Sequence, residues 1–128
     1  MTATVNTTGS NYLIRDGIVA NYKFSGNSII ENATFVNVSS LGFQSFYFCA
    51  NLRIVIALDT LLSIGSQCFS NCPKLEQLTL PDTIQSIGDN SFSSCTSLTS
   101  IDLPLNLSSI GSQAFYSCSK INSATFSA

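Results

Sequence analysis

Five cysteines and seven carboxylates are the residues of this 128-residue chain that could act in catalysis or bind a metal. The chain contains no histidine. Without histidine the chain lacks the usual general base near neutral pH and the commonest metal ligand, which excludes Cys-His and Ser-His nucleophilic devices. The acidic residues are scattered singly, at Asp16, Glu31, Asp59, Glu76, Asp82, Asp89 and Asp102. No pair of carboxylates for acid–base catalysis is indicated. We therefore expect no catalytic residues, no enzyme activity and no cofactor.

The cysteines raise the question of a metal site. Cys68 and Cys72 are four residues apart and could supply half of a zinc site on a helical turn. We favour structural thiols and no metal, because the place of Cys68 is taken by small residues in other copies of a repeat, Ser45, Ser91 and Ala114. Neighbouring thiols could approach the ~4.4–6.8 Å Cα separation of a disulfide. We interpret them as reduced, because the repeat alone explains where they stand.

An internal repeat of 23 residues organises the chain. The segments SIGSQCFSNC at 63–72, SIGDNSFSSC at 86–95 and SIGSQAFYSC at 109–118 are near copies. Aligning 40–62, 63–85, 86–108 and 109–128 places apolar residues in common columns, and 19–39 is a fainter copy. Two such columns are Phe46, Phe69, Phe92 and Phe115, and Cys49, Cys72, Cys95 and Cys118. A single copy cannot bury these side chains, but stacked copies can.

Each copy predicts a short strand followed by a short helix. LEQLTL and LTSIDL alternate apolar and polar residues as a half-buried strand does, and Pro81 and Pro104 end those strands. Ser66, Asp89 and Ser112, with Asn21 in the faint copy, stand where a side-chain oxygen caps a helix of one to two turns. We expect an α/β solenoid, a right-handed stack of about five rungs of 22–23 residues, with a parallel sheet on one face and short helices or turns opposite.

The two ends of the stack carry separate predictions. Residues 1–18 are interpreted as an N-terminal tail and capping hairpin strand, and 19–128 as the repeat domain. Asp16-Gly17 lies between apolar runs and predicts a hairpin that folds Tyr12–Ile14 over the first rung. The fifth rung has no predicted cover, so Ile121, Thr125 and Phe126 are expected to form a homodimer contact.

Composition limits the partners. Only 9% of residues are charged and the net charge is −2, which favours neither nucleic acid nor an anionic membrane surface. No stretch approaches the ~18 apolar residues of a membrane span. The start MTATVNTTGS lacks the basic and apolar regions of a signal peptide, so a cytoplasmic location stays open. Sequons at Asn6, Asn32, Asn37 and Asn106 are interpreted as chance matches in a Ser- and Asn-rich chain.

The outward positions of the predicted strands are the candidate partner-binding surface. Most are polar and uncharged, but Ile54 and Ile56 form an apolar pair beside Arg53. Such a pair framed by polar groups is a candidate contact patch, unless the N-terminal tail or a local irregularity covers it. The full candidate set is Arg53, Ile54, Ile56, Gln77, Thr79, Ser100 and Asp102.

The segment LEQLTLPDTIQSIGDNSFSSC closely resembles the BspA-like class of leucine-rich repeats, whose pattern is L-x-x-I-x-L-P-x-x-L-x-x-I-G-x-x-A-F-x-x-C. The resemblance is strong over 40–126 and weak over 19–39. Proteins with these repeats occur in bacteria and in parasitic protists such as trichomonads, mostly as surface proteins linked to adhesion. The resemblance implies a non-catalytic module that binds host or matrix proteins, on the cell surface or secreted. A self-assembling structural scaffold subunit is the alternative.

Overall fold

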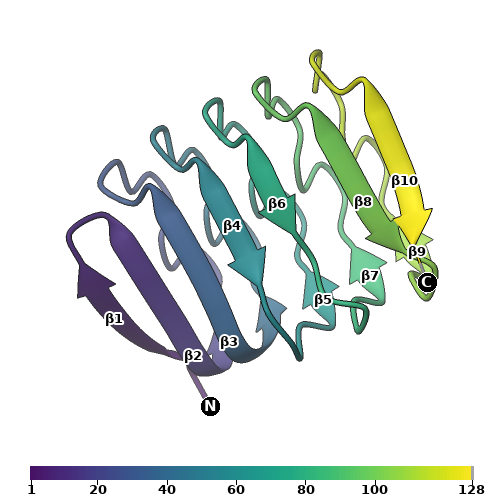
Figure 1. The fold of residues 1–128 in the computed structure, drawn as a ribbon. Helices are drawn as coiled ribbons and strands as arrows, with labels where there is room; N and C mark the ends of the chain where they lie inside the picture. Colours follow the sequence, from purple (N-terminus) through teal and green to yellow (C-terminus); the bar gives the residue numbers. More distant parts are fainter. Residues whose placement is uncertain (128) are drawn as a thin grey trace.

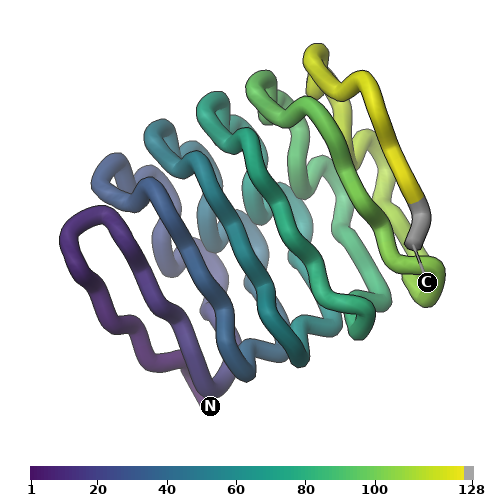
Figure 2. Tube along the Cα trace, viewed as in Figure 1, coloured from purple at the N-terminus to yellow at the C-terminus, as the bar shows by residue number. Residues whose placement is uncertain are grey.

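The computed structural model describes the backbone of residues 1–127 and the side chains of residues 1–125. Within this range the chain forms ten strands joined by turns, and it contains no helix. The strands wind as a solenoid, with the N-terminus at one end of the stack and the last described strand at the other (Figures 1 and 2). The α/β class is therefore wrong, and the fold is a β-solenoid.

Strands lie side by side along the front of the solenoid (Figure 1), and we call the parallel ones among them the front array. They are β2 (Asn11–Val19), β3 (Asn32–Leu41), β4 (Ile54–Ala57), β6 (Gln77–Thr79), β8 (Ser100–Pro104) and β10 (Ser123–Ser127). Their pairings are parallel, and the register places Ala33 opposite Val55 and Val55 opposite Leu78. Hydrogen-bonded pairing stops between β6 and β8, so β8 and β10 form a separate two-stranded sheet.

A second array of short strands forms another side of each rung. It comprises β5 (Ser63–Ile64), β7 (Ser86–Ile87) and β9 (Ser109–Ile110), and it begins where Ser40 and Leu41 of β3 pair with β5. A glycine follows each of these strands because the rungs approach closely there. A Cβ on Gly88 would lie 2.6 Å from the backbone nitrogen of Ser66 and 2.8 Å from the carbonyl carbon of Gly65.

The third side of each rung consists of tight turns where the sequence predicts a helix. Each of these turn segments contains two left-handed residues, for example Gln67 (φ 55°) and Asn71 (φ 59°). A left-handed residue cannot continue a right-handed helix. Alternate N–H groups instead bind the next rung, as the Phe69 N–H donates to the Ser91 carbonyl at 2.7 Å. The short helices were thus predicted wrongly, and turns bonded from rung to rung replace them.

The expected helix caps have a different role for the same reason. The Asn21 Oδ1 accepts the backbone N–H of Phe43 at 2.9 Å, and the Asp89 Oδ1 accepts that of Ser112 at 2.8 Å. Each acceptor bonds the residue at the same place one rung further on. Asn21 and Asp89 therefore link successive rungs and cap no helix.

The core lies between the three sides and contains a column of phenylalanines. Phe24, Phe46, Phe69, Phe92 and Phe115 stack with centroid separations of 5.0, 5.1, 5.3 and 5.3 Å. Phe46, Phe69 and Phe92 are fully buried. Each thiol of the cysteine column donates to the carbonyl of a phenylalanine in the preceding rung, for example Cys95 Sγ to Phe69 O at 3.2 Å. The predicted phenylalanine and cysteine columns are therefore confirmed.

The N-terminal hairpin is real, but its turn lies elsewhere than predicted. β1 (Thr4–Thr8) pairs antiparallel with β2, and the turn is Gly9-Ser10. Asp16 and Gly17 instead lie at a bulge in β2, where the pairing with β3 shifts register. A Cβ on Gly17 would lie 2.7 Å from the carbonyl oxygen of Met1, so the close N-terminal segment explains this glycine.

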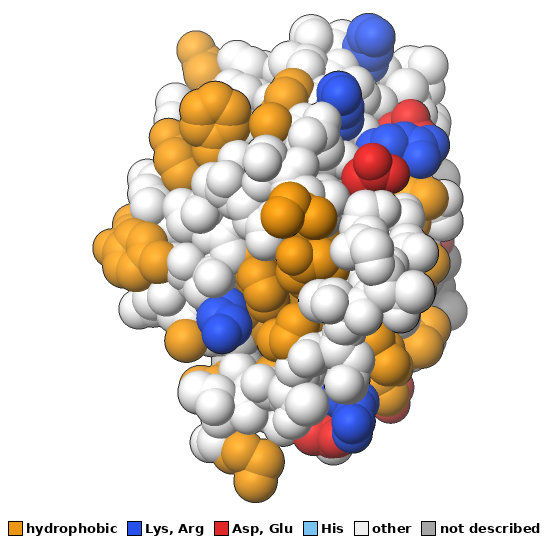
Figure 3. Space-filling model, turned by 90° about the vertical axis from the view of Figure 1, so that its left-hand side faces the viewer, with side chains coloured by type: hydrophobic (Ala, Val, Ile, Leu, Met, Phe, Trp, Pro, Cys, Tyr) orange, Lys and Arg blue, Asp and Glu red, His pale blue; other side chains and the backbone are white. Residues whose placement is uncertain are grey.

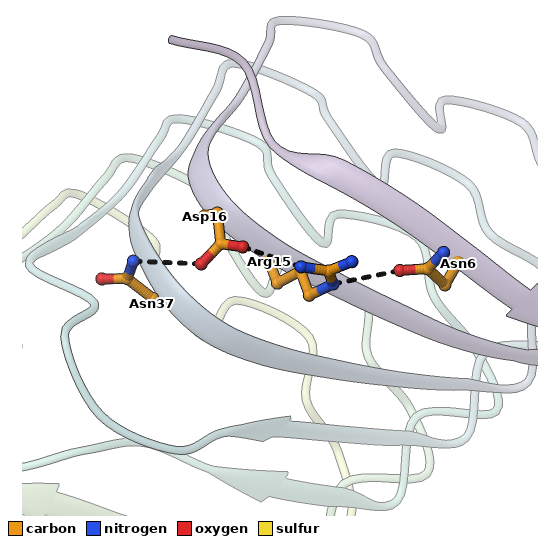
Figure 4. A network of polar contacts seen from close by, with 4 residues as sticks. All are labelled: Asn6, Arg15, Asp16 and Asn37. Carbon is orange, nitrogen blue, oxygen red and sulfur yellow. Dashed lines mark hydrogen bonds and ion pairs between the residues drawn. The ribbon is translucent and has the colours of Figure 1, made fainter.

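Polar side chains fasten the bulge to both neighbouring strands (Figure 4). The Arg15 Nε donates to Asn6 Oδ1 of β1 at 3.1 Å, and the Arg15 guanidinium pairs with Asp16 at 2.9 Å. The Asn37 Nδ2 of β3 donates to the other Asp16 oxygen at 3.1 Å. The hairpin is thereby tied to the first rung.

Candidate functional site: the outer face of the front array

The parallel register gathers the predicted site residues of β4 and β6 on one outer face. Ile54 lies opposite Gln77, and Ile56 lies opposite Thr79. On the other flank, β3 continues the same rows with Asn32 opposite Ile54 and Thr34 opposite Ile56. Because strands in a sheet are ~4.8 Å apart, these side chains form two continuous rows across the rungs.

Ser100 and Asp102 lie on β8, which follows β6 in the front array but pairs only with β10 among the described strands. Ser100 lies opposite Ser123 and Asp102 opposite Thr125. The Thr125 Oγ1 donates to Asp102 Oδ1 at 2.9 Å. The predicted face is therefore divided into a larger part on β3, β4 and β6 and a smaller polar part on β8 and β10.

Arg53 immediately precedes β4 and borders the larger part. Its guanidinium forms an ion pair with Glu76, which precedes β6, and the two side chains are 46% and 48% exposed. Exposed pairs of this kind stabilise a fold by only ~0–1 kcal/mol. The pair therefore serves mainly to place one positive and one negative group at the rim of the face.

Ile54 and Ile56 are less exposed than the sequence predicts. Both are partly buried, because polar side chains flank them on β3 and β6. The alternative that the N-terminal tail covers them is also wrong, because β1 lies beyond β2 at the end of the array (Figure 1). The pair forms a partly buried apolar centre between the polar side chains of β3 and β6.

The sequence reasoning missed the part of the face that the hairpin supplies. Leu13 of β2 lies opposite Thr34 and is 38% exposed. With Asn6, Thr8, Asn11 and Asn32 it lines a shallow hollow of about 340 Å³. The signal was Gly9-Ser10 between the runs TVNTT and NYLI, which would have placed Asn6 and Thr8 beside Leu13.

The residues predicted for self-association lie in the last rung. Ile121 is partly buried and Thr125 is exposed, whereas the side chain of Phe126 lies outside the described residues. In the described backbone, β10 pairs only with β8. Its outer edge therefore carries unpaired backbone groups, as edge strands do.

The thiols occupy packing positions. Cys68 lies 3.1 Å from the Ser45 hydroxyl, and Cys72 donates to the Phe46 carbonyl at 3.2 Å. Burial raises the pKa of Cys49 and of Cys68 to about 12, so both are protonated thiols at neutral pH. Among the described residues, no group of three or more Cys, Asp or Glu side chains could hold a metal ion. All five cysteines are free thiols.

The repeat geometry agrees with comparison to known families. The model described as the BspA type leucine rich repeat region (6 copies) matches residues 17–128. The chain therefore belongs to this family, whose repeats generally mediate protein interactions and are generally non-catalytic. Comparison with curated proteins gave no match. The part of the chain that the structure describes has no helix long and apolar enough to span a membrane.

Solved structures of bacterial leucine-rich repeat proteins share the fold. A leucine-rich repeat protein of Treponema pallidum is 25% identical with a TM-score of 0.82, over 95% of this chain and 67% of that one. A leucine-rich cell surface protein of Faecalibacterium prausnitzii is 18% identical with a TM-score of 0.77, over 97% and 43%. A protein of Bacteroides ovatus is 25% identical with a TM-score of 0.71, over 88% and 36%. The chain thus spans less than half of the latter two.

Proposed function

We propose that the chain is a non-catalytic protein-binding module whose partner contacts the outer face of the front array. One observation carries the proposal, which is the contrast between the two sides of each strand. Inward positions stay apolar from rung to rung, as Val55 and Leu78 do, while their outward neighbours Ile54 and Gln77 differ. Because the outward side chains vary while the core stays constant, the strands supply a rigid surface whose chemistry can be specific for one partner.

The chemistry of this face suits a protein surface. Its apolar centre, Ile54 and Ile56, lies between hydrogen-bonding side chains, and Arg53 and Glu76 stand at the rim. Protein interfaces combine an apolar centre with a polar rim in the same way. The absence of clustered charge on β4 and β6 disfavours a strongly charged partner.

The context of that binding is proposed to be adhesion to host or matrix proteins, at the cell surface or after secretion. The family membership supports this proposal, as does the likeness of the fold to a protein described as a leucine-rich cell surface protein. The solved chains of the Faecalibacterium and Bacteroides proteins are longer than this chain, so the partner is proposed for the face and not for a complete adhesin.

The face is tested by binding of the chain to a panel of purified matrix and plasma glycoproteins, measured by biolayer interferometry. Ile56→Asp and Thr79→Arg should each weaken a saturable interaction at least tenfold, because they place a charge in the apolar centre or its flank. Tyr116→Asp is the matched control, since Tyr116 is 57% exposed on the turn side of the last rung. Unchanged binding by both front-face variants would refute this surface.

A further inference from the structure

The N-terminal end of the solenoid carries a row of backbone acceptors. In the turn segment 20–26, the N–H groups of Tyr22, Phe24 and Gly26 donate to the carbonyls of Phe43, Ser45 and Tyr47 in the next rung, at 2.7–2.9 Å. By the same repeat, Asn21, Lys23 and Ser25 offer the corresponding carbonyls toward the N-terminal end. Among the described residues, no donor hydrogen-bonds to these three carbonyl oxygens.

A cavity of about 140 Å³ lies beside this row. Its apolar walls include Val5 of β1 and the core residues Ile14, Val19 and Phe24, and Lys23 borders it. An apolar cavity of about 150 Å³ is large enough to hold a benzene ring. The space therefore matches one apolar or aromatic side chain. Figure 3, which faces this end, shows apolar side chains gathered in a central band bordered by a basic group.

Lys23 marks the place where the phenylalanine column stops. Its ammonium lies 5.8 Å from the ring centroid of Phe24, whose ring also stacks on Phe46 at 5.0 Å. A cation over an aromatic face is attracted by the ring quadrupole. At the end of the column Phe24 thus contacts the exposed ammonium of Lys23 and the ring of Tyr12, whose centroid lies 5.8 Å away in a T-shaped contact.

We propose that a peptide segment of a protein partner, in the turn conformation of a rung, binds across this end of the solenoid. Its alternate N–H groups would bond the carbonyls of Asn21, Lys23 and Ser25, and one aromatic side chain would enter the cavity over Phe24. An acidic residue nearby would pair with the displaced ammonium of Lys23. In the next rung the corresponding carbonyls of Phe43, Ser45 and Tyr47 accept alternate N–H groups of a turn segment, which favours a peptide in that conformation over a compact small molecule.

This site is separate from the front face, so either can fail alone. The probe is a fluorescein-labelled peptide, SIGDNSFSSS, which copies residues 86–95 with Ser replacing Cys95. In the protein, the N–H groups of Asn90, Phe92 and Ser94 in this segment donate to the carbonyls of the following rung. The peptide therefore carries the three donors, an aromatic side chain and the acidic Asp89.

Fluorescence anisotropy should show saturable binding of this peptide to the 128-residue chain. N-methylation at the position of Phe92 removes one donor and should weaken binding at least tenfold. N-methylation at the position of Ser91 is the matched control, because the Ser91 N–H bonds within its own segment, to Gly88 O. Equal affinity of the two methylated peptides, or no saturation by 1 mM, would overturn the proposal.

Protein variants locate the peptide. Lys23→Glu should weaken binding at least fivefold, and Ala20→Phe, at an exposed residue that lines the cavity, should abolish it by filling the cavity. Lys120→Glu makes the same charge change at an exposed residue of the last rung and should leave the affinity unchanged. Urea midpoints check that all three variants fold. Binding that survives both Lys23→Glu and Ala20→Phe would place the peptide elsewhere and refute this site.

Discussion

The fourth and fifth rungs contain nearly the same ten residues, SIGDNSFSSC and SIGSQAFYSC, yet they differ greatly in burial. Ile87 is 1% exposed, whereas Ile110, at the same place one rung later, is 44% exposed. Phe92 is fully buried and Phe115 only partly. The motif therefore does not bury its own apolar residues. Each rung is covered by the rungs on either side, as Phe92 lies between Phe69 and Phe115.

The largest expected effect is a loss of stability when the stacked phenylalanine of the fourth rung is removed. Phe92→Ala should lower the free energy of unfolding by ~3–5 kcal/mol, because it removes a ring that is stacked on both faces. Phe115→Ala should cost about half as much, because its ring has one stacking partner among the described residues. Urea denaturation of both variants measures the difference. Equal losses would mean that the two rungs are equally packed.

A second prediction compares the same two rungs at their glycines, where the backbone is as crowded in the fifth rung as in the fourth. A Cβ on Gly88 would meet backbone of the preceding rung at 2.6 Å, and one on Gly111 would meet Asp89 at 2.4 Å. Overpacking typically costs ~1–3 kcal/mol, so Gly88→Ala and Gly111→Ala should destabilise the fold similarly. Ser112→Ala, at an exposed neighbour, is the control in the same urea experiment. An unchanged free energy of unfolding in Gly111→Ala would show that the last rung can shift away from the fourth rung.

Thiol chemistry gives a third, smaller difference between the rungs. Cys118 is only partly buried, whereas Cys72 is fully buried and its burial raises the pKa of its thiol. Because the thiolate is the reactive form, iodoacetamide should alkylate Cys118 faster than Cys72, and the rate at Cys118 should rise with pH. Mass spectrometry of the native protein should find Cys118 labelled first and Cys72 last. Labelling of Cys72 at a comparable rate would contradict the assigned burial.

The smallest effect concerns self-association, which stays a prediction for Ile121, Thr125 and Phe126. Light scattering at high micromolar concentration should give twice the monomer mass, because the outer edge of β10 is unpaired among the described strands. Phe126→Asp should restore the monomer without changing the free energy of unfolding by more than ~0.5 kcal/mol. A monomer at all concentrations would refute the predicted homodimer.

The columns of the core could be predicted because a 23-residue period fixes them independently of local structure. Phe69 and Phe92 must coincide once the rungs stack, whatever connects them. The same period placed Ile54, Gln77 and Thr79 on one outer face, since residues in register alternate between two sides of a strand. The family likeness followed from these offsets.

Three features could not be predicted, each for a local reason. The turns replaced helices because Gln67 and Asn71 adopt left-handed conformations that their residue types do not demand. The Asp16-Gly17 turn became a bulge because the N-terminal segment crowds Gly17, a contact between distant residues. The partial burial of Ile54 depends on the side chains of neighbouring rungs, which a single repeat does not specify.

The hydrogen bonds between turn segments run from each rung to the next, as from Phe69 to Ser91 and from Phe92 to Ala114. They therefore lie along the axis that joins the two ends of the stack. Tension applied between the termini loads the junctions between rungs in series, so the weakest junction opens alone while the others hold. A molecule stretched in an optical trap should lengthen in small successive steps, one rung at a time. A single all-or-none extension would show that the rungs share the load.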